Sequence, residues 1–106
     1  MARKTILIVE DDEDLLRGLS VRLSASGYRV VSATDAISAT SLAKKEEPDL
    51  AILDIGIPGG DAFILMERLK KLTPVPIPVI ILTGRDPLTE KERAFEAGAI
   101  AFLIKP

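Results

Sequence analysis

Five polar residues of this sequence stand at the ends of four short apolar runs. They are Glu10, Asp11, Asp54, Thr83 and Lys105. If the four runs are neighbouring strands, three carboxylates, a hydroxyl and an ammonium group meet at one edge of one sheet. Carboxylate oxygens bind divalent cations, and hydroxyl and ammonium groups hold phosphoryl oxygens. The pattern therefore predicts a site for a divalent cation and a phosphoryl group.

The three carboxylates of this cluster need a partner that offsets their mutual repulsion. Two carboxylates about 5 Å apart repel each other by roughly 3 kcal/mol at an effective dielectric constant of 20. The chain has no His and no Cys, so an ion at this edge would have only oxygen ligands. Such a set favours Mg²⁺, Mn²⁺ or Ca²⁺ over zinc or copper. A carboxylate can also attack phosphorus and form an aspartyl phosphate.

Each residue of the cluster has a simpler interpretation when it is taken alone. The acidic run 10–14 could cap a helix and compensate its dipole. Asp54 and Thr83 could belong to turns, and Lys105 could be a solvated surface lysine. These interpretations require several polar groups to fall at strand ends by coincidence, so the conjunction favours a common site.

Short apolar runs alternate with longer amphipathic stretches along the chain. The expected strands lie at 5–9, 28–32, 50–53, 79–82 and 101–104. The expected N-caps of the four helices are Asp12, Asp35, Asp61 and Asp86. Gly27 is expected to end the first helix and Gly98 the fourth. The alternation predicts an α/β fold with a doubly wound, five-stranded, mostly parallel sheet, whose less apolar strand 28–32 lies at an edge. Ligands of such sheets bind beyond the carboxyl ends of the strands.

Composition narrows the class of protein. The chain has 106 residues, of which 47% are hydrophobic, so we expect one globular domain. The absence of Cys and His excludes disulfides, thiol nucleophiles and His-based catalytic triads. The net charge of −2 gives no general attraction to nucleic acid or to an anionic membrane. No apolar run approaches the roughly 20 residues of a membrane helix, and we expect a cytoplasmic protein.

The chain resembles the receiver domain of two-component response regulators. The resemblance covers nearly all of the sequence and rests on several motifs, which are Ile6–Asp12, Leu53–Pro58, Ile81–Gly84, Ala97–Ala99 and Phe102–Pro106. It implies a flavodoxin-like sheet with the strand order 2-1-3-4-5. It also implies a signalling switch, not a metabolic enzyme, with only weak intrinsic phosphoryl transfer and autodephosphorylation.

The resemblance assigns a phosphoacceptor and a metal site. Asp54 would accept a phosphoryl group from a histidine kinase or a phosphotransfer protein. Asp11 and Asp54 would bind Mg²⁺, or Mn²⁺ in its place, together with the main-chain carbonyl group of Gly56. Glu10 would act mainly through a water molecule bound to the metal.

The resemblance also assigns a conformational readout. Lys105 would pair with the acceptor carboxylate and then with the phosphoryl group. Thr83 would move to hydrogen-bond that group, and Phe102 would rotate inward as Thr83 moves. An output domain C-terminal to this segment and a homodimer are both compatible with the resemblance.

The chain departs from the family pattern in two places, and each departure predicts a structural consequence. Ala62 stands where the family usually has Gly, and it would be strained if that backbone needs a positive φ. The chain stops at Pro106, so we expect a receiver domain over residues 1–106 that is truncated before its C-terminal helix. Apolar side chains on the first and fifth strands would then be uncovered, and the isolated chain would dimerise or aggregate.

Three alternative functions compete with the switch. A haloacid-dehalogenase-like phosphatase requires a second Asp two residues after its nucleophile, where this chain has Gly56. A flavodoxin-like cofactor binder requires a phosphate cradle after the first strand, where this chain has the acidic run 10–12. The third alternative is a receiver-like interaction scaffold that is never phosphorylated. The complete set of site residues argues against it, whereas Ala62 and the missing helix leave it some room.

Overall fold

A computed structural model of the chain describes residues 3–56, 62–72, 75–84 and 88–105. Strands and helices alternate along these residues. The strands are β1 (Thr5–Val9), β2 (Arg29–Ala33), β3 (Leu50–Asp54), β4 (Val79–Thr83) and β5 (Ala101–Ile104). The helices are α1 (Glu13–Ala25), α2 (Ala36–Glu46), α3 (Ala62–Leu72) and α4 (Leu88–Glu96). The five strands and the helices between them lie within a few residues of the positions that the sequence predicts.

The five strands form one parallel sheet in the order β2-β1-β3-β4-β5. This order confirms the doubly wound fold and places β2 at an edge, as its polar composition indicates. The register pairs Val9 with Leu53, Asp54 with Leu82, and Thr83 with Ile104. Because all strands run in the same direction, their carboxyl ends meet at one edge of the sheet, where ligands of such folds bind.

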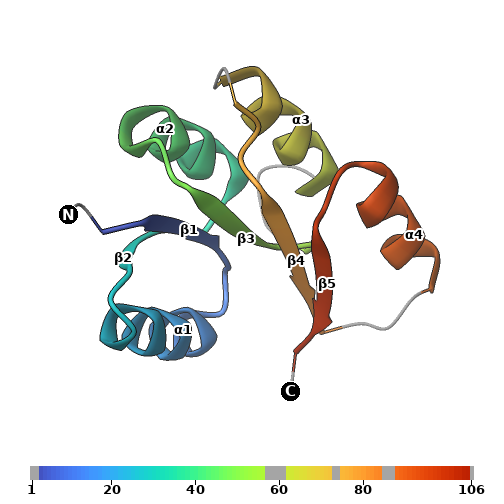
Figure 1. Cartoon of the computed structure of the whole chain (residues 1–106). Helices are drawn as coiled ribbons and strands as arrows, with labels where there is room; N and C mark the ends of the chain where they lie inside the picture. Colours follow the sequence, from blue (N-terminus) through green and yellow to red (C-terminus); the bar gives the residue numbers. More distant parts are fainter. Residues whose placement is uncertain (1–2, 57–61, 73–74, 85–87, 106) are drawn as a thin grey trace.

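Helices lie on both faces of the sheet (Figure 1). α2 and α3 cover one face, α1 covers part of the other, and α4 lies beside β5. The core lies mainly under α2 and α3, where Leu7, Leu53 and Ile81 from neighbouring strands are fully buried against Leu65 and Met66 of α3. The central strands are thus held in place by apolar contacts, and their carboxyl ends remain free to carry polar residues.

Local hydrogen bonds explain where the helices begin and end. Asp12 caps α1 by accepting hydrogen bonds from the backbone N–H groups of Asp14 and Leu15, and Asp35 caps α2 through Ser38. Glycines with positive φ follow α1 and α4, as predicted. They are Gly27 (φ 97°) and Gly98 (φ 105°). The other two predicted caps, Asp61 and Asp86, lie outside the described residues.

The expectation of strain at Ala62 is not met. Among the described residues, Glu47 alone combines a side chain larger than hydrogen with a positive φ, of 48°. Ala62 begins α3 with an ordinary backbone and its side chain is fully buried. A methyl group is therefore accommodated where a positive φ would have required Gly.

The face of the sheet beside α1 is only partly covered. The prediction that β1 would be uncovered is wrong, because every residue of β1 is buried. α1 lies close to β1 and β2, and it does not reach β5, where Leu103 is 52% exposed. A cavity of about 520 Å³ opens on this face, lined by Lys4, Ile6, Leu23, Tyr28, Asp49, Leu50, Ile52 and Ile80. The uncovered apolar surface thus lies over β3, β4 and β5.

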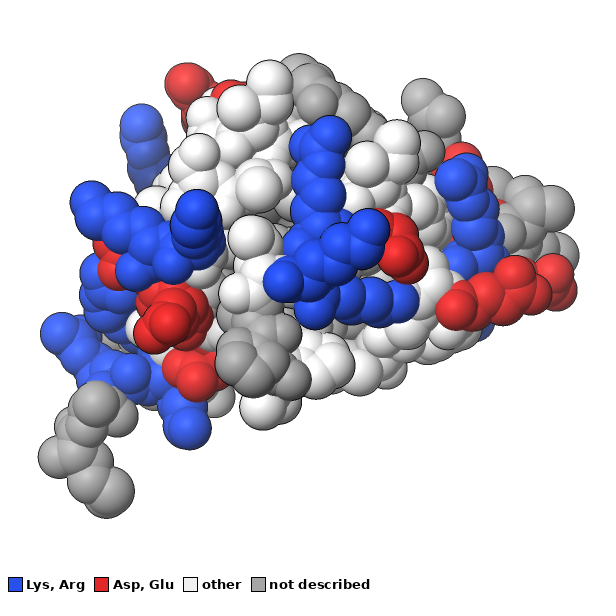
Figure 2. All heavy atoms as spheres, turned by 90° about the horizontal axis from the view of Figure 1, so that it is seen from above, with Lys and Arg blue, Asp and Glu red and all other residues white. Residues whose placement is uncertain are grey.

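The charges on the surface are mixed in sign. Figure 2 shows Lys and Arg side chains standing beside Asp and Glu over the face that carries α2 and α3. Within the described part of the chain, no helix has the length and apolar character that crossing a membrane requires.

Candidate functional site

The three predicted carboxylates lie together at the carboxyl edge of the sheet. One oxygen from each of Glu10, Asp11 and Asp54 lies within 4.8 Å of the others. β1 and β3 are neighbours in the sheet, so the residues that follow β1 meet the residue that ends β3. Glu10 and Asp54 are buried and Asp11 is exposed. The cluster is open to solvent on the side of Asp11.

Glu10 is the most buried acid of the cluster, with 1% of its surface exposed. Its backbone N–H donates to the carbonyl oxygen of Ala33 on β2 at 3.1 Å. Its Oε2 accepts a hydrogen bond from the backbone N–H of Asp12 at 3.2 Å. Burial raises the pKa of Glu10, and the negative charge of Asp54 acts in the same direction, whereas Lys105 opposes them.

Lys105 contacts two of the three carboxylates. Its Nζ lies 2.6 Å from Oε1 of Glu10 and 3.4 Å from Oδ2 of Asp54. Its backbone N–H donates to the carbonyl oxygen of Thr83 at 2.7 Å, which fixes it beside the end of β4. Partial burial by itself lowers the pKa of Lys105, but the contact with Glu10 and the charges of Asp54 and Glu10 outweigh it, so the pKa is raised. The ammonium group is therefore held in its charged form.

A cavity of about 490 Å³ lies at this edge. It is lined by Asp54, Ile55, Gly56, Thr83, Gly84 and Lys105. Thr83 is 3% exposed, so its hydroxyl group is close to the protein interior. Four of the predicted site residues thus surround one cavity.

The sequence reasoning did not assign Gly84 to the site. Its missing side chain leaves room near Lys105, since a Cβ there would lie 3.8 Å from Cδ of the lysine.

Phe102 lies on β5 and does not line this cavity. It pairs with Ile81 of β4 in the sheet register, and its half-buried ring packs against the hydrophobic core. Two residues further along the chain, Ile104 pairs with Thr83. The aromatic ring is therefore linked to the site through the β4–β5 pairing and not by direct contact.

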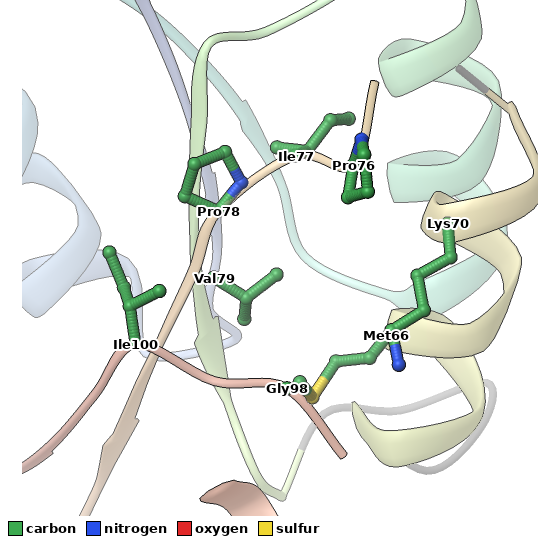
Figure 3. Close-up of a pocket in the computed structure, with 8 residues that line it drawn as sticks. All are labelled: Met66, Lys70, Pro76, Ile77, Pro78, Val79, Gly98 and Ile100. Carbon is green, nitrogen blue, oxygen red and sulfur yellow. The ribbon is translucent and has the colours of Figure 1, made fainter. Parts of the chain in front are cut away.

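A second cavity lies away from the carboxylate cluster, between α3 and the start of β4 (Figure 3). It has a volume of about 220 Å³, and its lining includes Met66, Lys70, Val79 and Ile100. None of the residues predicted to do chemistry lines it. The cavity that four of the predicted site residues line is a different one, at the opposite end of the strands.

The geometry agrees with the comparisons with known proteins. The family model of the response regulator receiver domain matches residues 6–106. The chain belongs to this family. The Escherichia coli transcriptional regulatory protein BasR is 42% identical over 103 residues, which cover 95% of this chain and 45% of BasR. This receiver domain therefore spans less than half the length of that regulator.

Solved receiver structures have the same fold. The non-phosphorylated HemR receiver domain from Leptospira biflexa gives a TM-score of 0.89 at 38% identity, covering 98% of this chain and 83% of that chain. A response regulator protein from Burkholderia pseudomallei, crystallised with a phosphorylated aspartic acid, a calcium ion and citrate, gives 0.89 at 27% identity. That match covers 97% of this chain and 60% of the other.

The donor atoms of this receiver domain suit a hard cation. The oxygens of Glu10, Asp11 and Asp54 converge within 4.8 Å, and the chain contains no softer His or Cys ligand. Oxygen-only sets of this kind bind Mg²⁺, Mn²⁺ or Ca²⁺.

The contact of Lys105 with Glu10 was not predicted, since strand spacing indicates which residues meet at an edge but not which oxygen a flexible ammonium group approaches.

Proposed function

We propose that this receiver domain is a phosphorylation-dependent switch whose phosphoacceptor is Asp54. The observation that carries the proposal is the environment of this carboxylate. It lies within 4.8 Å of two other acids, 3.4 Å from the ammonium group of Lys105, and in one cavity with Thr83. The phosphorylated aspartic acid of the Burkholderia pseudomallei relative supports the same chemistry here.

The donor would be a phosphohistidine of a sensor histidine kinase or a phosphotransfer protein. A carboxylate oxygen of Asp54 attacks the phosphorus atom, an O–P bond forms and the P–N bond breaks. The imidazole leaves with the electron pair of that bond and takes up a proton. Lys105 Nζ, which lies within reach of the Asp54 carboxylate, would hold one phosphoryl oxygen, and the hydroxyl group of Thr83 would donate to another.

The acidic cluster would hold the divalent cation. Asp11, Asp54 and the main-chain carbonyl group of Gly56 are the proposed protein ligands, with Glu10 acting through a bound water molecule. Mg²⁺, or Mn²⁺ in its place, supplies positive charge that neutralises the phosphoryl oxygens when it is bound. Because Asp11 is the exposed member of the cluster, it would face the incoming ion and its waters.

Phosphorylation would act by shifting a two-state equilibrium. A shift from 1:99 to 99:1 needs about 5.5 kcal/mol of differential stabilisation. Charge-assisted hydrogen bonds contribute about 1.5–3 kcal/mol each, so two or three new contacts from Lys105 and Thr83 would suffice. Movement of Thr83 would then alter the β4–β5 pairing and rotate Phe102, which pairs with Ile81 two residues before Thr83.

A relative of known role supports a proposal for the complete regulator. BasR is a transcriptional regulatory protein in which the matching segment is 45% of the length. We propose that the present segment, residues 1–106, likewise receives the signal for an output domain on its C-terminal side, in the cytoplasm. Metabolic catalysis is no part of this role. The position two residues after Asp54, where a haloacid-dehalogenase-like phosphatase has its second acid, is occupied by Gly56.

An intact-mass measurement tests the proposal. Incubation of the protein with acetyl phosphate and Mg²⁺ is expected to add one phosphoryl group, and the adduct is expected to be absent from Asp54→Asn. Asp14→Asn is the matched control, because Asp14 is an exposed acid of α1 outside the cluster. A folded wild-type protein that forms no adduct would contradict the switch and favour the scaffold.

A further inference from the structure

Few side chains of α4 pack against the rest of the domain. Among those that the structure describes, residues 90–96, Ala94 alone is buried. Phe95 and four charged residues of this helix are exposed. An element with so few buried contacts is easily displaced.

A contact between Arg93 and Phe63 joins α4 to α3. The guanidinium carbon of Arg93 lies 4.1 Å from the centroid of the Phe63 ring. Phe63 is the second residue of α3 and is only 7% exposed, and its ring belongs to the hydrophobic core. A cation over an aromatic face is attracted to it, and the attraction depends on the position of the cation over the ring. The contact therefore favours one position of α4 relative to α3.

Both helices follow directly from strands that end at the phosphoacceptor cavity. β3 ends at Asp54 and α3 begins at Ala62, whereas β4 ends at Thr83 and α4 begins at Leu88. The amino-terminal ends of both helices point toward the edge of the sheet that carries the cavity (Figure 1). A rearrangement around a phosphoryl group at this edge therefore acts on the amino-terminal ends of both helices, and the Arg93–Phe63 contact lies between them.

We propose that the contact between Arg93 and Phe63 holds α4 in its unphosphorylated position and thereby opposes phosphorylation of Asp54. This inference rests on the proposed function and names a regulator of the same site. If phosphorylation favours a displaced α4, then a contact that favours the present position must disfavour phosphorylation to the same extent, because the coupling is reciprocal. Arg93 is thus a positioning residue that acts through α4.

The expected size of the effect follows from the strength of such contacts. A cation–π contact of ordinary strength changes an equilibrium about 2- to 30-fold. Loss of the contact should therefore raise the population of the displaced arrangement by about this factor. The rate at which acetyl phosphate and Mg²⁺ form the adduct on Asp54 should rise with it while that arrangement is the minor one.

The test compares Arg93→Met with the wild-type protein. Met keeps an unbranched apolar side chain and removes the charge, so adduct formation is expected to accelerate about 2- to 30-fold. Backbone amides of α4 should exchange hydrogen faster, while those of β1 and β3 should be unchanged. Arg93→Lys, which keeps a cation, should lie close to the wild type. Arg68→Met, at an exposed position of α3, is the matched control and should behave as the wild type.

A double-mutant cycle separates regulation from a general effect on stability. In the Phe63→Leu background the ring is already absent, so Arg93→Met should change the adduct rate and the exchange of α4 less than it does in the wild type. The inference is overturned if Arg93→Met forms the adduct at the wild-type rate, or if its acceleration is equally large in that background. Failure of the proposed function would look different, since the wild-type protein itself would then form no adduct.

Discussion

Lys105 makes its shorter ion pair with Glu10, at 2.6 Å, and its longer one with Asp54, at 3.4 Å. The ammonium group is thus shared between the proposed phosphoacceptor and the most buried acid of the site. Such an arrangement offsets the repulsion among the carboxylates before a cation or a phosphoryl group arrives. Lys105 therefore contributes to the stability of the resting domain as well as to the chemistry proposed for it.

Replacement of Lys105 by Met should destabilise the metal-free domain. The buried Glu10 would lose its counter-charge, and leaving a buried acceptor without its partner costs about 1–3 kcal/mol. Urea denaturation in the presence of a chelator at neutral pH would measure this loss. Lys44→Met, which removes an exposed lysine of α2, should leave the unfolding free energy unchanged. Equal stability of the two variants would contradict the role of Lys105.

Magnesium should stabilise the folded domain through the acidic cluster. A ligand that binds only the folded state at 100 times its dissociation constant adds about 2.7 kcal/mol to the unfolding free energy. Asp11→Asn removes one charged oxygen donor and should reduce this gain at the same Mg²⁺ concentration. Asp14→Asn retains the cluster and serves as the control. If Mg²⁺ stabilises Asp11→Asn as much as the control, the site is not at this cluster.

Stability should depend on pH through Glu10. Burial raises the pKa of Glu10 above its ordinary value of 4.5, so the folded protein binds this proton more tightly than the unfolded chain does. The contribution of Glu10 is therefore fully present below pH 4.5 and is lost as the pH rises through the higher folded pKa. Glu10→Gln lacks this loss. Denaturation in chelator across that pH range should show a steeper fall in the wild type, and parallel profiles would refute the assignment.

Two glycines should respond to alanine in opposite directions. Gly98 follows α4 with a φ of 105°, and an added Cβ would lie 3.4 Å from Nζ of Lys70, so Gly98→Ala should destabilise the domain by about 1–2 kcal/mol. Gly18 lies inside α1 with nothing within 4 Å of an added Cβ, so Gly18→Ala should stabilise it by about 0.5–1 kcal/mol. Thermal denaturation of both variants checks the pair, and a shift of the same sign in both would disprove the explanation.

Much of the site could be predicted because parallel strands align their carboxyl ends. Glu10, Asp54 and Thr83 each stand at the end of an apolar run, and the structure brings them to one edge. The position of a residue relative to its strand is enough for this conclusion. The contact of Lys105 with Glu10 was beyond such reasoning, because it depends on the torsion angles of a long side chain inside the cavity.

The uncovered sheet face was predicted correctly for β5 and wrongly for β1. One side of α1 carries a stripe of leucines, Leu15, Leu16, Leu19 and Leu23. Such a stripe predicts a helix that packs on the sheet, but it does not indicate over which strands the helix lies. α1 lies close to β1 and β2, so β1 is buried while Leu103 on β5 is half exposed. The contact of Arg93 with Phe63 escaped prediction for a similar reason, since it joins two helices whose relative position no local pattern describes.

The exposed apolar face should cause the 106-residue chain to associate. Contiguous apolar surface over β3, β4 and β5 favours contact with a second copy or with further molecules. Leu103→Gln should weaken this association in light scattering at high protein concentration. Ile37→Gln, which changes an exposed isoleucine on α2, is the control and should associate as the wild type does. A wild-type chain that stays monomeric would contradict association through this face.

The residues of the site come from nearly the whole length of the chain, from Glu10 to Lys105. Glu10 and Asp11 follow β1, Asp54 ends β3, Thr83 ends β4 and Lys105 follows β5. No short fragment can therefore assemble the cluster, and the non-local pairing of β1, β3, β4 and β5 must come first. Such long-range pairing is slow, because loop-closure entropy is lost before the contacts form. The repulsion among the carboxylates should thus act only in the last stage of folding, after the transition state. It should therefore change the unfolding rate more than the folding rate.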